Sequence, residues 1–64
     1  MIHPLILLLK QYNSTHNTRF VAIGFKRDLH VKDQYSCELK LNNKSRRVLC
    51  NELEQMIRNG LVQI

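Results

Sequence analysis

The sequence predicts a small α+β domain in which an antiparallel three-stranded sheet is flanked by an N-terminal and a C-terminal helix (α-β-β-β-α). Three observations lead to this fold class: an apolar run behind a proline, a strict alternation of apolar and polar residues, and apolar residues at helical spacing before a glycine. A chain of 64 residues has the length of one domain, so we treat residues 1–64 as a single unit.

The first expected element is a helix over about residues 4–12. Pro4 suits the first turn of a helix, because its missing N–H needs no partner there. The leucine-rich stretch behind it continues through Tyr12 to a polar cluster at 13–18, which indicates a loop. The apolar run at 5–9 leaves a second interpretation open, a first strand buried on both faces.

Two strands are expected next, at 20–25 and 34–41. The first is a compact run of β-branched and aromatic residues between turn-prone and charged segments, which indicates a strand buried on both faces. In the second, every other residue is apolar, at Tyr35, Cys37, Leu39 and Leu41. This alternation predicts one apolar face and one face in water.

A tight hairpin is expected at Asn42 and Asn43, since asparagine tolerates positive φ. The chain then returns as a third strand, in a register that places Val48 opposite Cys37, Cys50 opposite Tyr35, and Arg47 opposite Glu38. This register puts the apolar pairs on one face and pairs opposite charges.

The last element is expected to be a short helix. Asn51 and Glu54 have the spacing of a capping box, and Gly60 is a C-terminal stop. Apolar residues stand at helical spacing between them, at Leu53, Met56 and Ile57. A single longer helix over 45–59 is the alternative, because Leu49 extends the same stripe. Residues 61–64 remain to cap the sheet or to pair at its edge.

The sequence does not indicate an enzyme. It has no glycine-rich phosphate loop, no nucleophile elbow and no zinc-protease motif. Cys37 and Cys50 are expected on the core face, where a thiol packs as a small hydrophobe, and the histidines stand in separate segments. We therefore expect no catalytic residue, no metal site and no cofactor.

The apolar opening does not have the form of a signal peptide or a membrane span. It lacks a basic segment and a cleavage site, and its apolar run is too short to cross a bilayer. We expect a soluble intracellular protein, located in the cytoplasm and without a membrane partner.

The balance of charge favours a partner that carries phosphate. Ten Lys and Arg against five Asp and Glu give a net charge of +5, which points to nucleic acid, either RNA or DNA. The main expected contacts lie around the hairpin, at Lys40, Lys44, Arg46 and Arg47, and secondary contacts at the preceding turn, at Lys26, Arg27 and Lys32. Such contacts give low sequence specificity. The alternative is that the charges only keep the hairpin soluble and free of edge-to-edge aggregation.

Two families show a limited similarity. The order helix, strand, strand, strand, helix resembles the double-stranded RNA-binding domain, over about a third of the chain. His30 followed by Tyr35, Leu39 and Leu41 is similar to that family's loop histidine and second strand, and Ser45-Arg46-Arg47 to the basic start of its last helix. The resemblance implies binding to RNA, but few residues remain before the basic run for the family's third strand. Strands followed by a C-terminal helix are similarly found in single-strand-binding coactivators of the positive-cofactor type.

The leucine run also predicts self-association. Successive helical positions are about 100° apart, so five apolar residues cover the whole circumference, and one sheet cannot bury every side. We expect a homodimer or docked partner at Leu5, Leu7, Leu8 and Leu9. If only Leu7 is exposed, no partner is needed. The rival function is therefore a protein-interaction module, such as a viral or phage accessory factor.

Overall fold

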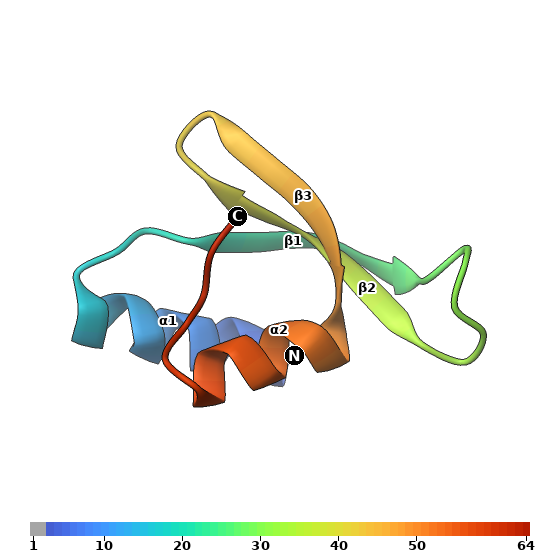
Figure 1. The fold of residues 1–64 in the computed structure, drawn as a ribbon, viewed down its shortest axis with the longest axis horizontal. Coiled ribbons are helices and arrows are strands. Elements are labelled where there is room, and N and C mark those ends of the chain that lie inside the picture. The colour runs from blue at the N-terminus through green and yellow to red at the C-terminus, as the bar shows by residue number, and fades with distance from the viewer. Residues whose placement is uncertain (1–2) are drawn as a thin grey trace.

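The computed structural model describes residues 3–64 and contains five elements in the predicted order. They are α1 (Pro4–His16), β1 (Val21–Arg27), β2 (Tyr35–Leu41), β3 (Lys44–Leu49) and α2 (Cys50–Arg58). The strands form one antiparallel sheet in the order β1-β2-β3, and both helices lie on the same side of it (Figure 1). The predicted α-β-β-β-α fold class is confirmed, and the alternative of one helix over 45–59 is wrong.

Helix α1 extends four residues beyond its predicted end, because the polar residues after Tyr12 continue its exposed side. The Nδ1 atom of His3 caps the start by accepting a hydrogen bond from the Leu5 N–H at 3.1 Å. Asn17 ends the helix in the left-handed conformation, at φ 55°. The predicted loop is thereby reduced to the short segment that leads into β1.

The β2–β3 hairpin has the predicted register in its centre. Val48 pairs with Cys37 and Arg47 pairs with Glu38, across a two-residue turn in which Asn42 has a φ of 56°. Positive φ at this asparagine is what the tight turn requires. The last pair is Leu49 with Ser36, so the sequence located β2, the turn and β3 correctly except for the end of β3.

The predicted pairing of Cys50 with Tyr35 is wrong, because Cys50 is the first residue of α2. The Oε1 atom of Glu52 accepts a hydrogen bond from the Leu49 N–H at 3.2 Å and so satisfies a backbone donor at the helix start. The helix therefore begins before the capping box predicted at Asn51, and its capping carboxylate is Glu52.

Strand β1 contains a bulge that the sequence did not predict. The register passes from Ile23 opposite Glu38 to Lys26 opposite Ser36, and Gly24 has a φ of +64°. A glycine in the left-handed region followed by one extra residue is a common form of bulge. It resets the alternation of side chains, so that Phe25 packs against the core and stacks on His3, with ring centroids 4.2 Å apart.

The expectation that 20–25 is buried on both faces is wrong, because three of these residues, Val21, Ile23 and Gly24, are exposed. Val21 and Ile23 are 49% and 42% exposed, because the helices cover only one face of the sheet. Phe20 and Ala22 point toward the helices and are buried. The outer face of the sheet therefore carries apolar groups in water.

The core lies between the sheet and the two helices. Its buried apolar residues are Leu5, Leu9, Tyr12, Phe20, Ala22, Cys37, Leu39, Val48, Leu53 and Val62. The C-terminal segment rises from α2 toward the sheet (Figure 1) and closes the core with Val62, whose N–H donates to the Tyr12 hydroxyl at 3.2 Å. Within residues 3–64, no helix has the length and apolar character that crossing a membrane requires.

Candidate nucleic-acid interface

The hairpin end of the sheet gathers four basic side chains from two distant segments. Lys40 and Lys44 flank the turn between β2 and β3, and Arg46 follows on β3. Arg19 comes from the segment before β1, and it reaches the same end because Val21 pairs with Lys40. We call Arg19, Lys40, Lys44 and Arg46 the hairpin-end group.

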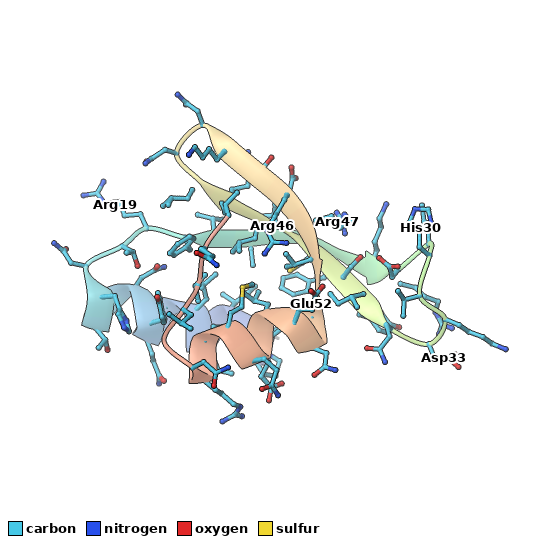
Figure 2. All side chains as sticks on the ribbon, in the orientation of Figure 1. Arg19, His30, Asp33, Arg46, Arg47 and Glu52 are labelled. Atoms are coloured by element: carbon cyan, nitrogen blue, oxygen red, sulfur yellow. The ribbon has the colours of Figure 1, made fainter. Side chains whose placement is uncertain are left out.

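Arg19 was missing from the site that the sequence predicted. It lies on the wall of a shallow, open groove whose other side belongs to the hairpin, at Leu41 and Asn42. More than twenty positions separate it from the basic run, so only the register of β1 against β2 reveals that it belongs there. Figure 2 shows Arg19 on the hairpin side of the molecule.

Arg46 and Arg47 do not lie on the same face of the sheet, because neighbouring residues of a strand point to opposite faces. Arg46 pairs with Leu39 and lies on the side of the helices, where its Nη2 atom is 3.9 Å from the Met56 sulfur. Arg47 pairs with Glu38 and lies on the outer face. Both arginines are labelled on β3 in Figure 2.

Arg47 is occupied within the protein. Its Nη1 atom donates to the Gly24 carbonyl oxygen at 3.2 Å and to the Ser36 hydroxyl oxygen at 3.1 Å. The Ser36 side chain is fully buried, so it needs a partner of this kind. The guanidinium thus crosses β2 and holds the bulge of β1, and we leave Arg47 out of the candidate phosphate site.

The basic residues of the other turn are offset by acids. Lys26, Arg27 and Lys32 share the β1–β2 end with Asp28 and Asp33, and the Arg27 guanidinium lies 3.9 Å from the Asp33 carboxylate. Figure 2 shows His30 and Asp33 together at this far end. Two carboxylates there balance two of the three cations, so the end carries little net charge.

Asp28 organises that turn. Its Oδ2 atom accepts hydrogen bonds from the N–H groups of His30 and Val31, at 2.9 and 2.7 Å. These bonds lower the pKa of the Asp28 carboxyl, so the group is charged at neutral pH. The negative charge is therefore built into the turn.

The hairpin-end group has no such compensation. All four side chains are exposed, and within residues 3–64 none of them forms an ion pair. No Asp or Glu occurs in residues 1–27 or 39–51, the two stretches of sequence that contain the four cations. The geometry therefore concentrates unpaired positive charge at one end of the molecule.

The residues that resemble the double-stranded RNA-binding domain are not arranged for that family's mode of contact. Ser45, Arg46 and Arg47 lie on β3 and not at the start of the last helix, where Glu52 stands in the first turn. His30 is exposed on the β1–β2 turn, away from the hairpin. The order of elements agrees with the resemblance, but the basic surface lies elsewhere.

The two thiols are free and protonated at neutral pH. Burial raises the pKa of Cys37 to about 11, and it also raises the pKa of Cys50. A protonated thiol is neither a good nucleophile nor a good metal ligand. In the described part of the chain, no three His, Cys, Asp or Glu side chains come together in a way that could hold a metal ion.

The predicted leucine interface is largely inside the protein. Leu5 and Leu9 are 4% and 2% exposed, and Leu8 is half-buried. Helix α2 packs against the side of α1 that the sheet leaves open, a contact that the local sequence pattern does not indicate. Of the four predicted residues only Leu7 is exposed, next to Ile6, so the buried pair is not available to a partner.

Comparison with known proteins gives no match to a family model, to a curated protein or to a solved structure.

Proposed function

We propose that this protein binds the phosphate backbone of nucleic acid through the hairpin-end group and carries out no catalysis. The observation that supports this is the collection of four exposed cations, from two separate segments, at an end where the described residues 3–64 form no ion pair and supply no Asp or Glu. Unpaired surface lysines and arginines repel one another, and phosphate groups relieve this repulsion while releasing counterions. The opposite end of the sheet differs in net charge, because its two aspartates balance two of its three cations.

The binding is of low sequence specificity. Lysine and arginine at phosphates position a protein on nucleic acid but do not read bases. Base stacking needs an exposed aromatic ring, and the exposed ring of Tyr35 lies at the β1–β2 end of the sheet, whereas Phe20 beside Arg19 is buried. We therefore expect similar affinities for unrelated sequences, and stronger binding to duplexes, whose phosphates are denser than those of single strands.

We place this activity inside the cell. Both cysteines are free thiols, and one of them is buried, as is usual in a reducing compartment. The chain then acts as a small intracellular regulatory protein that binds nucleic acid without modifying it.

The test is binding to short fluorescent duplexes of DNA and RNA and to single strands, followed by anisotropy from about 50 to about 200 mM salt. Four phosphate contacts predict a slope of log affinity against log salt between about −3 and −4 on duplex DNA, a loss of about a hundredfold over this range. Absence of binding at the lowest salt would rule the function out. Affinities that depend strongly on the nucleotide sequence would contradict binding through the phosphate backbone.

A further inference from the structure

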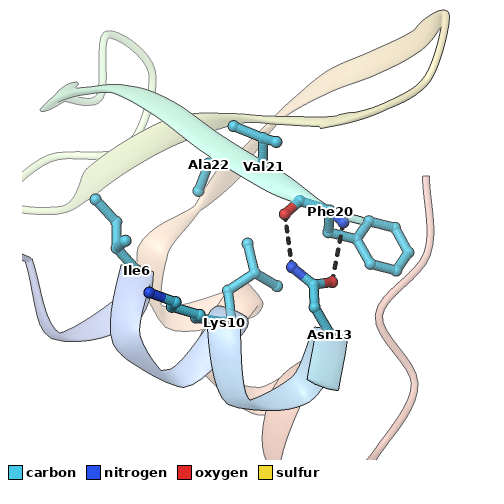
Figure 3. A pocket seen from close by; sticks show the side chains of 7 residues that line it. Ile6, Lys10, Asn13, Phe20, Val21 and Ala22 are labelled. Atoms are coloured by element: carbon cyan, nitrogen blue, oxygen red, sulfur yellow. Dashed lines mark hydrogen bonds between the residues drawn. The ribbon is translucent and has the colours of Figure 1, made fainter. Parts of the chain in front are cut away.

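The free edge of β1 has an unusual neighbour. The Asn13 side chain donates from Nδ2 to the Phe20 carbonyl oxygen at 2.8 Å, and its Oδ1 atom accepts from the Phe20 N–H at 2.9 Å (Figure 3). In an antiparallel ladder, a residue of an adjacent strand would form the same two hydrogen bonds with the N–H and C=O of Phe20. Asn13 therefore takes the place of a missing strand at this one residue.

The next pair of backbone groups along the edge is left open. The N–H and C=O groups of successive strand residues point to alternate sides, so those of Ala22 point to the same edge as those of Phe20. Ala22 lies opposite Leu39 in the register, but by this alternation the backbone groups that point toward β2 are those of Val21 and Ile23. Among the hydrogen bonds that the described residues make outside the ladder, none involves Ala22. An open donor and acceptor on an edge strand can pair with an added strand.

A groove lies directly beside this edge, between α1 and β1. Its volume is about 200 Å³, and its walls are mostly apolar (Figure 3). The lining residues are Ile6, Leu9, Lys10, Asn13, Phe20, Val21 and Ala22. An extended chain at this edge would therefore have a place for an apolar side chain and would pass the ammonium group of Lys10.

Charge identifies the kind of chain that fits. Lys10 lies in the groove, Arg19 lies before the strand and Lys26 near its end, and residues 1–27 contain no acid. A second copy, paired antiparallel about Ala22, would bring both copies of Lys10 together and would set Arg19 toward the other copy's Lys26. Like charges placed opposite one another are destabilising, so the charges of this edge favour an acidic chain over a second copy.

We propose that the free edge of β1 binds a short, extended, acidic segment of a partner protein by strand addition. The segment's backbone pairs with the N–H and C=O of Ala22, an apolar side chain enters the groove, and a carboxylate pairs with Lys10. The bulge at Gly24 bends the strand and limits the added segment to a few residues. This site has Arg19 at its border in common with the hairpin-end group, but its main contacts, at Ala22 and Lys10, do not depend on nucleic-acid binding.

The proposal is tested by nuclear magnetic resonance on the full chain labelled with ¹⁵N. The probe is the blocked peptide Glu-Val-Thr-Val-Glu, and Lys-Val-Thr-Val-Lys is its control. In the free protein, the Ala22 amide should exchange with solvent faster than those of Val21 and Ile23. The acidic peptide should shift the Ala22 signal and slow its exchange about tenfold at about ten times Kd. The proposal is overturned if neither peptide binds, if both bind equally, or if the shifts centre on Lys40 and Lys44.

Two charge reversals complete the test. Lys10→Glu should lower the affinity for the acidic peptide by about tenfold and make the basic peptide the better ligand. Lys32→Glu changes net charge equally but lies on the β1–β2 turn, so it should leave both affinities nearly unchanged. Both lysines are exposed, so neither change removes a core contact. Equal effects of the two reversals would reduce the binding to general electrostatic attraction and overturn the proposal.

Discussion

The guanidinium of Arg47 lies across the outer face of the sheet and joins β3 to the bulge of β1. It donates to a backbone carbonyl at Gly24 and to the hydroxyl of Ser36, a residue that is fully buried. A Cβ atom at Gly24 would lie 3.2 Å from the Nη2 atom of Arg47, which shows how closely the side chain covers the bulge. The role of this arginine is to stabilise the sheet.

Replacing Arg47 with alanine should therefore destabilise the fold. Two hydrogen bonds are lost, which predicts a decrease of about 1 to 3 kcal/mol in the free energy of unfolding, measured by urea denaturation. Arg46→Ala is the matched control, since Arg46 makes only a weak contact with a sulfur atom, and it should cost less than about 0.5 kcal/mol. Equal losses in the two variants would contradict the assigned role.

Cys37 makes the stability sensitive to alkaline pH. Burial raises the pKa of its thiol from the ordinary value of 9.0 to about 11 in the folded protein. The unfolded chain thus loses the proton first, so the contribution to stability is complete below about pH 9 and is lost as pH rises toward about 11. The melting temperature should fall across this window.

The control for this prediction is Cys37→Ala. The variant is less stable overall, because it leaves a cavity in the core, but its decline in alkali should be shallower than that of the natural protein. An identical decline in both proteins would show that other groups cause it.

At the scale of the elements, the start of α2 depends on one carboxylate. Glu52 accepts the Leu49 N–H, whereas Glu54 forms an exposed ion pair with Arg58 at 3.0 Å. Glu52→Ala should cost about 1 kcal/mol of stability, and Glu54→Ala less than about 0.5 kcal/mol. Thermal unfolding followed by circular dichroism compares the two. A larger loss at Glu54 would mean that the helix begins where the sequence alone predicts it.

The elements that the sequence predicted well are those with a strong local signal. The alternation at 35–41 and the two asparagines after it give the strand, the turn and the register of the hairpin. The bulge in β1 had no such signal, because a glycine within an apolar run does not indicate whether its φ is positive. The extension of α1 was missed because polar residues on an exposed helical side have the composition of a loop.

At the scale of the whole molecule, the candidate site could be predicted only in part. Lys40, Lys44 and Arg46 are close in the sequence, so their grouping needed only the hairpin. Arg19 depends on how β1 pairs with β2, and Arg47 depends on what its side chain bonds on the outer face. Neither can be derived from composition or spacing.

The charge distribution gives the molecule two unlike ends. The hairpin end has exposed cations without acids, and the β1–β2 end has cations held among aspartates. The chain thus supplies a control within itself, because two lysines can be removed from either end with the same change in net charge. A protein that bound phosphates only through its overall charge would respond equally to both changes.

The most direct test compares Lys40→Ala/Lys44→Ala with Lys26→Ala/Lys32→Ala in binding to duplex DNA over the salt series. In the hairpin variant, the slope of log affinity against log salt should become shallower by about 2, and binding at about 50 mM salt should weaken by at least tenfold. In the control variant, this slope should stay within about 0.5 of the slope of the natural protein. Equal losses in the two variants, or a larger loss in the second, would contradict a phosphate site at the hairpin end.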